Sequence, residues 1–178
     1  MSYEKNLEIE KKYLINVKSL PFSLENLEKQ EIEQYYISKK PTIRIRKSNE
    51  TYILTIKTKN SSDIIEAKVN KELETLINKE EYTNLLNLVK TLNSKPIIKN
   101  RYIFDLGNGY IAEIDEFLGD FKGIYIVEVE FKDNNTIAEF EKPKWFGKDV
   151  SLEKIFVNAY MSAVENAQEI IAYYFNNI

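Results

Sequence analysis

Pairs of like charges two residues apart recur along this chain, and they constrain its fold more than any other feature. The first is in EIEKKYLI, where Glu8 and Glu10 are separated by the apolar residue Ile9. Side chains alternate between the two faces of a β-strand, so both members of such a pair lie on one face. Like charges that close together repel each other unless a group of opposite charge lies between them. The pattern therefore predicts strands whose charged faces are turned toward one another.

Eight extended segments carry this alternation. We predict strands at residues 7–15, 31–38, 42–47, 51–59, 64–77, 95–106, 110–117 and 124–131. Gly107-Asn108-Gly109 is typical of a hairpin turn, because glycine and asparagine tolerate positive φ. One face of the strands is apolar. The other carries the bases Lys12, Arg44, Arg46, Lys57, Lys99 and Arg101 and the acids Glu8, Glu10, Glu72, Glu74, Glu113, Asp115, Glu128 and Glu130.

An eight-stranded antiparallel sheet can close into a barrel whose interior admits side chains or one small ligand. With the charged face turned inward, a basic and an acidic surface oppose each other across that interior. Two alternatives remain: an open sheet with one solvated face, and a lipocalin-like carrier whose register is shifted by one residue to give an apolar interior. We predict an α+β, mainly β fold, a closed eight-stranded antiparallel β-barrel or tunnel with a charged lumen and flanking helices.

Three segments favour helix or turn. Residues 19–30 contain Pro21, which can open a short helix. Asn78 and Glu81 form a capping box before a helix that we expect to end near Asn93. A final helix is predicted at residues 151–176, with an apolar stripe of Leu152, Ile155, Phe156, Ala159, Ala163 and Ala167. We expect these helices to cover part of the apolar outer face of a single domain, residues 1–178.

Composition narrows the chemistry. The 178 residues include no cysteine and no histidine, which excludes disulfides, thiolate sites and the usual general base. Oxygen atoms must then hold any metal, which indicates magnesium, manganese or calcium. The net charge of −3 gives no attraction to nucleic acid or to an anionic membrane. No signal core or apolar run of about 18 residues is present, so we expect a cytoplasmic protein.

A lumen lined by both charges suits a polyanion accompanied by divalent cations. Arginine and lysine bind phosphate oxygens, and carboxylates hold the metals that bridge those oxygens. For the isolated E-x-E-x-K string, Glu8, Glu10 and Lys12, the other interpretation is a solvated strand face. The later charged pairs favour the metal-ligand interpretation.

The ordered motifs resemble the CYTH family, also called triphosphate tunnel metalloenzymes, over nearly the whole chain. The matching segments are EIEKKYLI, IEQYYIS, TIRIRK, LTIKTK, KELETLI, KNRYIF, AEIDEFLGDFKG, IVEVEF and EKPKWFGKDV, the last of which contains Lys148. The sequence departs from the family pattern at Asn70 and Leu76, where many members have an arginine and a third acid. Lys68 or Lys71 would then substitute for the arginine.

This resemblance implies a divalent-metal-dependent hydrolase of a small-molecule triphosphate, with Mg²⁺ or Mn²⁺ as cofactor and neither nucleic acid nor membrane as partner. It assigns the phosphate chain to Lys12, Arg44, Arg46, Lys57, Lys99, Arg101 and Lys148. It assigns metal binding to Glu10, Glu128 and Glu130, and a second metal or the attacking water to Glu8 and Asp115. Lys57 joins Glu8 and Asp115 as a catalytic candidate, and Glu72, Glu74 and Glu113 are further tunnel acids.

Inorganic tripolyphosphate, cleaved to pyrophosphate and phosphate, is the expected substrate, because nothing in the sequence indicates a nucleobase pocket. The resemblance also admits a nucleoside or thiamine triphosphatase and a class IV-type adenylate cyclase. A non-catalytic module that binds polyphosphate or nucleotide remains a further alternative. The apolar outer face would also allow a homodimer.

Overall fold

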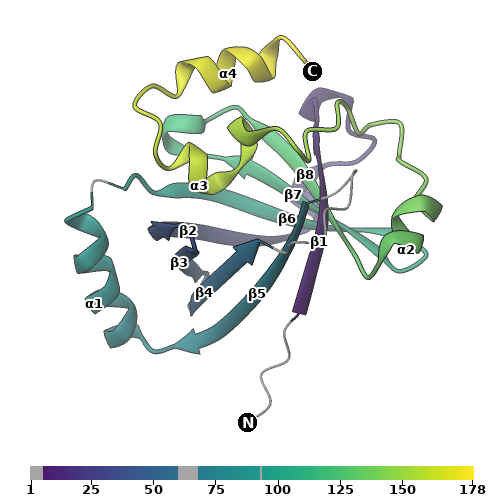
Figure 1. The fold of residues 1–178 in the computed structure, drawn as a ribbon. Helices are drawn as coiled ribbons and strands as arrows, with labels where there is room; N and C mark the ends of the chain where they lie inside the picture. Colours follow the sequence, from purple (N-terminus) through teal and green to yellow (C-terminus); the bar gives the residue numbers. More distant parts are fainter. Residues whose placement is uncertain (1–5, 60–67, 93) are drawn as a thin grey trace.

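The eight strands of the described chain form one closed antiparallel barrel (Figure 1). The computed structural model describes residues 6–59, 68–92 and 94–178. The strands are β1 (Asn6–Leu14), β2 (Glu28–Lys39), β3 (Thr42–Ser48), β4 (Thr51–Lys59), β5 (Lys68–Ile77), β6 (Ile97–Gly107), β7 (Tyr110–Phe117) and β8 (Tyr125–Phe131). Their order around the barrel is β1-β5-β4-β3-β2-β6-β7-β8. Because β1 pairs with both β5 and β8, the barrel prediction is confirmed and the open sheet is excluded.

The predicted strands and the first long helix are found close to their expected positions. The turn at Gly107-Asn108-Gly109 has positive φ at all three residues and joins β6 to β7 as a hairpin. Asn78 and Glu81 form the predicted capping box of α1 (Lys79–Lys90), which ends before the predicted Asn93. β2 begins earlier than expected, and residues 64–67 of the predicted fifth strand, like Asn93, lie outside the described residues.

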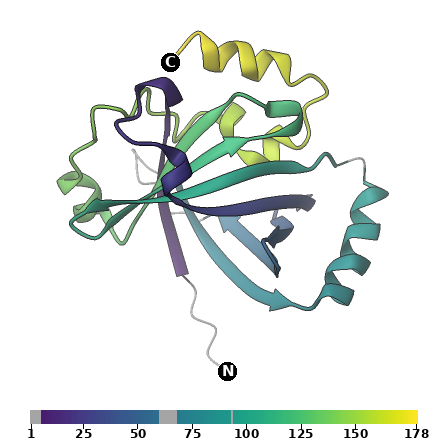
Figure 2. The ribbon, with the colours of Figure 1, turned by 180° about the vertical axis from the view of Figure 1, so that it is seen from behind.

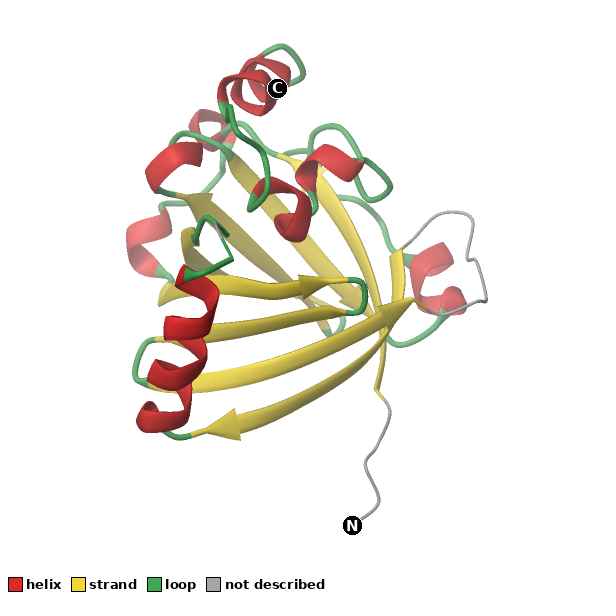
Figure 3. Ribbon diagram, turned by 60° about the vertical axis from the view of Figure 1, so that its left-hand side comes forward, coloured by secondary structure: helices red, strands yellow, loops and turns green. Residues whose placement is uncertain are grey.

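Short segments and α1 cover the apolar outer face. The first 3₁₀ helices, η1 (Val17–Ser19) and η2 (Leu24–Asn26), replace the single helix or turn expected at residues 19–30. Their segment, shown in purple in Figure 2, packs with Trp145 and Phe146 on the outer side of β1, β7 and β8. α1 covers the opposite part of the barrel, over Ile45 and its neighbours on β2–β4 (Figure 3). The lipocalin-like alternative is excluded, because the apolar face is on the outside.

The prediction of one final helix at residues 151–176 is wrong. The segment contains three short helices: η4 (Lys154–Phe156), α3 (Asn158–Met161) and α4 (Gln168–Phe175). Lys95 explains the break, because its backbone N–H donates to Ser162 O and its Nζ donates to Glu165 O. Asn166 Oδ1 then accepts from the N–H of Gln168 and starts α4 anew. The backbone carbonyl oxygens of Ser162 and Glu165 thus accept hydrogen bonds from Lys95, and the segment does not continue as one helix.

The C-terminal segment covers one end of the barrel and not its side. Interior positions change there from charged to apolar, so that Leu14 follows Lys12, Phe117 follows Asp115 and Ile126 precedes Glu128. These side chains pack with Tyr174 of α4 and Phe156 of η4 in one buried cluster, and Figure 1 shows α3 and α4 above this end. The charged part of the interior is therefore bounded on this side by an apolar layer.

Two further helices were not expected from the sequence: η3 (Gly119–Phe121) and α2 (Asn134–Glu139). The Asp133 carboxylate caps α2 by accepting from Thr136 N, and Thr136 Oγ1 accepts from Asp133 N in return. Among the described residues, no helix has both the length and the apolar character needed to cross a bilayer.

Candidate active site

The strand register gathers the predicted charged residues inside the barrel. Lys12 on β1 lies opposite Glu128 on β8, Arg101 on β6 opposite Asp115 on β7, and Lys57 on β4 opposite Glu72 on β5. All the predicted interior residues except Glu130, together with Thr55 and Asn70, form two networks. The β7 network contains Glu10, Lys12, Lys99, Arg101, Glu113, Asp115 and Glu128, and the β5 network contains Glu8, Arg44, Arg46, Thr55, Lys57, Asn70, Glu72 and Glu74.

The β7 network is the more deeply buried of the two. Asp115 is 0% exposed, and it accepts from Arg101 Nε and Nη2 at 2.7 and 2.8 Å and from Lys99. Arg101 Nη2 also donates to Glu128 Oε2 at 2.7 Å, and Glu128 accepts a further bond from Lys12. These charge-assisted bonds fix the acids and bases of this half in one arrangement.

The β5 network is more open, and its arginine–carboxylate contacts are longer. Lys57 Nζ lies 2.6 Å from Glu8 and 2.9 Å from Glu72. Arg44 and Arg46 both direct Nη2 at Glu74, at 3.3 and 3.1 Å. Glu74 also accepts from Thr55 Oγ1 at 2.7 Å. A carboxylate thus lies between the two arginines, as the R-x-R pattern requires.

Burial and neighbouring charges shift several pKa values. Burial and the neighbouring Arg101 lower the pKa of Lys99 to about 8, against the pull of Asp115. Burial raises the pKa of Glu72 to about 7 in spite of Lys57. Burial would also raise the pKa of Glu74. The charge of Arg46 and the hydrogen bond from Thr55 outweigh burial there and lower this pKa to about 2. At neutral pH, Glu74 is therefore an anion.

Two buried donors of the site lack a partner. The Nε atoms of Arg44 and Arg46 make no hydrogen bond within the described chain. An unsatisfied buried donor is costly, and a guanidinium binds phosphate with two parallel N–H groups. These two atoms therefore favour an anionic ligand inside the barrel.

Two predicted site residues lie apart from the networks. Glu130 is exposed and makes no ion pair or hydrogen bond with any described residue, and burial together with Glu8, Glu113 and Glu10 raises its pKa. Lys148 is also exposed, and its Nζ lies 2.8 Å from Glu153 and contacts Tyr173 of α4. The structure therefore does not bring Lys148 to the interior.

The donor chemistry fits a hard divalent cation. The predicted interior set has eight acids and six bases, and the surplus acid Glu130 is repelled by neighbouring carboxylates. No three acidic side chains of the described residues converge at metal-binding distance. Each paired acid points at a base instead, so a metal would have to draw the carboxylates together.

Neutral polar side chains of the interior were not assigned a role from the sequence. Gln34, Tyr36, Thr55 and Asn70 are all buried beside the charged residues. Gln34 Nε2 donates to Tyr36 Oη at 2.9 Å, and Asn70 Nδ2 donates to Glu8 at 3.3 Å. Thr55 and Asn70 lie two residues from Lys57 and Glu72 on their strands, and this spacing was the signal that could have found them. Gln34 and Tyr36 lie opposite Arg46 and Arg44, a relation that depends on strand pairing.

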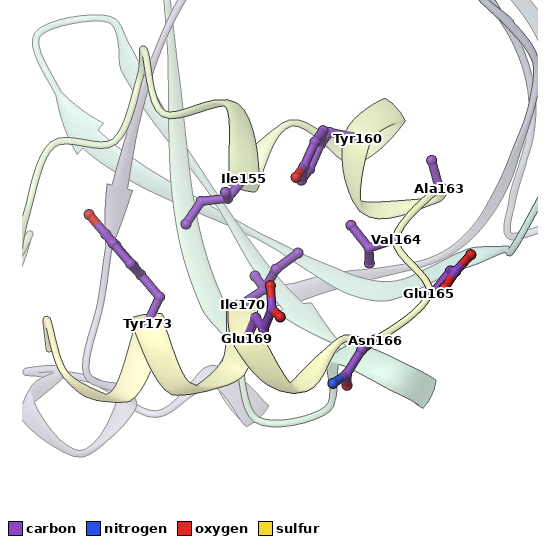
Figure 4. Close-up of a pocket in the computed structure, with 9 residues that line it drawn as sticks. All are labelled: Ile155, Tyr160, Ala163, Val164, Glu165, Asn166, Glu169, Ile170 and Tyr173. Carbon is purple, nitrogen blue, oxygen red and sulfur yellow. The ribbon is translucent and has the colours of Figure 1, made fainter.

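A surface pocket of about 550 Å³ lies elsewhere, between η4, α3 and α4 (Figure 4). Ile155, Tyr160 and Tyr173 contribute to its wall, and none of its lining residues is a lysine or an arginine. It lacks the charge that a phosphate chain needs, so the barrel interior remains the candidate site.

Comparison with known proteins agrees with this arrangement. The CYTH domain model matches residues 6–157, which is most of the sequence. The chain belongs to the CYTH family. An inorganic triphosphatase of Acetivibrio thermocellus is 31% identical over 125 residues, which cover 70% of this chain and 73% of the relative. An inorganic triphosphatase of Nitrosomonas europaea is 27% identical over 155 residues, which cover 85% and 93%.

Solved structures of the family have the same fold. A crystal structure of an inorganic triphosphatase is 25% identical and superposes with a TM-score of 0.62, over 89% of this chain and 96% of that one. A conserved hypothetical protein from Pyrococcus furiosus is 21% identical with a TM-score of 0.55, over 74% and 82% of the two chains, and shows the fold alone.

Proposed function

We propose that this CYTH protein hydrolyses a triphosphate inside its barrel, with inorganic tripolyphosphate as the preferred substrate. The observation that carries the proposal is the pair of unpartnered Nε donors on Arg44 and Arg46 in a lumen lined by both charges. The two curated relatives are named inorganic triphosphatases, which supports the same reaction class. No nucleic acid or membrane is needed as a partner.

The basic residues would bind the phosphate chain. Arg44 and Arg46 each offer an unpartnered Nε donor. Lys57 lies between Glu8 and Glu72 on the same side of the lumen. Lys12, Lys99 and Arg101 hold positive charge on the β7 side. We leave Lys148 out of the proposed set, because its ammonium group pairs with Glu153 outside the barrel.

The acids would bind a divalent cation and orient water. We assign Glu10, Glu128 and Glu130 to Mg²⁺ or Mn²⁺, which when bound would neutralise negative charge on the phosphate chain. Glu8 and Asp115 would orient the water that attacks the terminal phosphorus in line with the leaving pyrophosphate. Lys57 would stabilise charge on the phosphate chain as the bond breaks.

A substrate and metal panel tests the proposal. Purified protein is incubated with tripolyphosphate, ATP or thiamine triphosphate, each with Mg²⁺, Mn²⁺, Ca²⁺ or EDTA, and phosphate release is measured. We expect release from tripolyphosphate with Mg²⁺ or Mn²⁺ and none with EDTA. Binding without release would indicate a non-catalytic module, and cyclic AMP with pyrophosphate from ATP would indicate a cyclase; either result contradicts the proposal.

A further inference from the structure

The three interior arginines differ in how completely they are bound. Arg101 engages all three of its donor nitrogens, because Nε and Nη2 contact Asp115, Nη2 contacts Glu128, and Nη1 contacts Glu113. The N–O distances from Arg101 to Asp115 and Glu128 are 2.7–2.8 Å, typical of strong charge-assisted bonds. Every side-chain nitrogen of Arg101 is therefore bonded to a carboxylate in the free protein.

Arg44 and Arg46 each reach the β5 glutamates through a single nitrogen atom. The hydrogen bonds that these guanidinium groups donate to the β5 glutamates come from Nη2, at distances of 3.1–3.4 Å. Their Nε atoms are buried and unpartnered within the described chain. Long bonds to a single nitrogen are weak for an arginine–carboxylate pair, whose favoured geometry uses two parallel bonds. These contacts can therefore be exchanged for better ones.

Glu74 is the carboxylate that both arginines share. Its side chain is 38% exposed, compared with 13% for Glu72, so it has room to turn away from the lumen. One hydrogen bond, from Thr55 Oγ1 at 2.7 Å, holds it from the neighbouring strand β4. A phosphate group would offer the arginines more oxygen atoms and more negative charge than this carboxylate does.

We propose that Glu74 is a displaceable internal counter-ion, which occupies the phosphate-binding side of Arg44 and Arg46 until substrate takes its place. This inference rests on the proposed function, and it concerns how that site selects its ligand. Because Glu74 competes with the ligand, its charge weakens the binding of any phosphate chain. A short anion such as monophosphate displaces it poorly, whereas a multiply charged triphosphate displaces it well.

Direct titration tests the proposal. Tripolyphosphate is titrated calorimetrically into the wild-type protein and into Glu74→Gln, in EDTA so that the metal-dependent reaction is suppressed. The variant keeps the shape of the side chain and removes its charge, so Kd for tripolyphosphate should fall by about tenfold, as for the loss of one close like charge. Glu50→Gln removes the same charge from an exposed turn and should leave Kd unchanged.

A second variant tests displacement with the charge retained. Thr55→Val removes the hydroxyl that holds Glu74, so Kd should fall by about twofold if displacing this carboxylate costs that bond. An unchanged or higher Kd in Glu74→Gln overturns the proposal, and so does a higher Kd in Thr55→Val. Phosphate release by the wild-type protein is measured separately. Absence of release would contradict the proposed function, whereas an unchanged Kd in Glu74→Gln would contradict only the role of Glu74.

Discussion

Lys57 Nζ on β4 lies 2.6 Å from Glu8 Oε1 on β1, across the intervening strand β5. The same ammonium group lies 2.9 Å from Glu72 on β5. One cation thus joins three neighbouring strands at the point where β1 closes the barrel. Without this ammonium group, the partly buried carboxylates of Glu8 and Glu72 would lose the positive charge that offsets their mutual repulsion.

Replacement of this cation should affect both stability and turnover. Lys57→Met leaves Glu8 and Glu72 without their shared partner, and we expect the free energy of unfolding to fall by about 2 kcal/mol. Phosphate release from tripolyphosphate should fall by about 100-fold or more. Urea denaturation and a phosphate assay measure the two effects. Lys122→Met, at an exposed lysine between β7 and β8, is the control and should change neither. Wild-type stability and turnover in Lys57→Met would contradict the assignment.

The segment around Gly147, which forms hydrogen bonds with the end of β1, gives a second prediction. Gly147 N donates to Leu14 O at 2.8 Å, and a Cβ atom at this glycine would lie 2.7 Å from that oxygen. Gly147→Ala must therefore push the segment away from β1, and we expect a loss of about 1–3 kcal/mol in unfolding free energy. Chemical denaturation measures it, with Leu152→Ala, at an exposed site in the same segment, as control. Equal stability of Gly147→Ala and the wild type would show that the contact relaxes freely.

The pKa of Glu72 predicts how stability changes with pH. Burial raises this pKa from its ordinary 4.5 to about 7, with Glu8 adding to the effect and Lys57 opposing it. Between these values the folded protein binds more protons than the unfolded chain, so the free energy of unfolding falls as pH rises from about 4.5 to 7.

A neutral replacement should remove this dependence. Relative to the wild type, Glu72→Gln should be more stable at pH 8 than at pH 5, by an amount on the order of 1 kcal/mol after allowance for solvent screening. Urea denaturation of both proteins at the two pH values measures the difference, and groups that titrate equally in both proteins cancel. The same stability difference at pH 5 and pH 8 would mean that Glu72 keeps an ordinary pKa.

The barrel could be predicted because the pattern that indicates it lies within single strands. Alternation within single strands, such as Arg44 and Arg46 on β3 or Glu128 and Glu130 on β8, identifies the charged face without knowledge of strand pairing. Like charges on one face then favour an enclosed arrangement over a solvated one. The closed barrel confirms this inference.

Features that depend on distant contacts could not be predicted in this way. The apolar stripe of residues 151–176 indicated one helix, but Lys95, more than 60 residues earlier, divides it through Ser162 and Glu165. Lys148 lies within a motif that resembles the family pattern, yet its position depends on Glu153 and Tyr173. The unequal engagement of Arg44 and Arg101 likewise follows from strand register, which the sequence pattern leaves open.

Phosphate release from tripolyphosphate with Mg²⁺ or Mn²⁺ by the wild type, Arg44→Ala and Glu130→Ala tests the central claim most directly. Arg44 represents the bases inside the barrel, and Glu130 represents the acids that we assign to the cation. We predict release by the wild type and a loss of about 100-fold or more in each variant, with circular dichroism showing that both remain folded. Near-normal turnover in both folded variants would contradict the account.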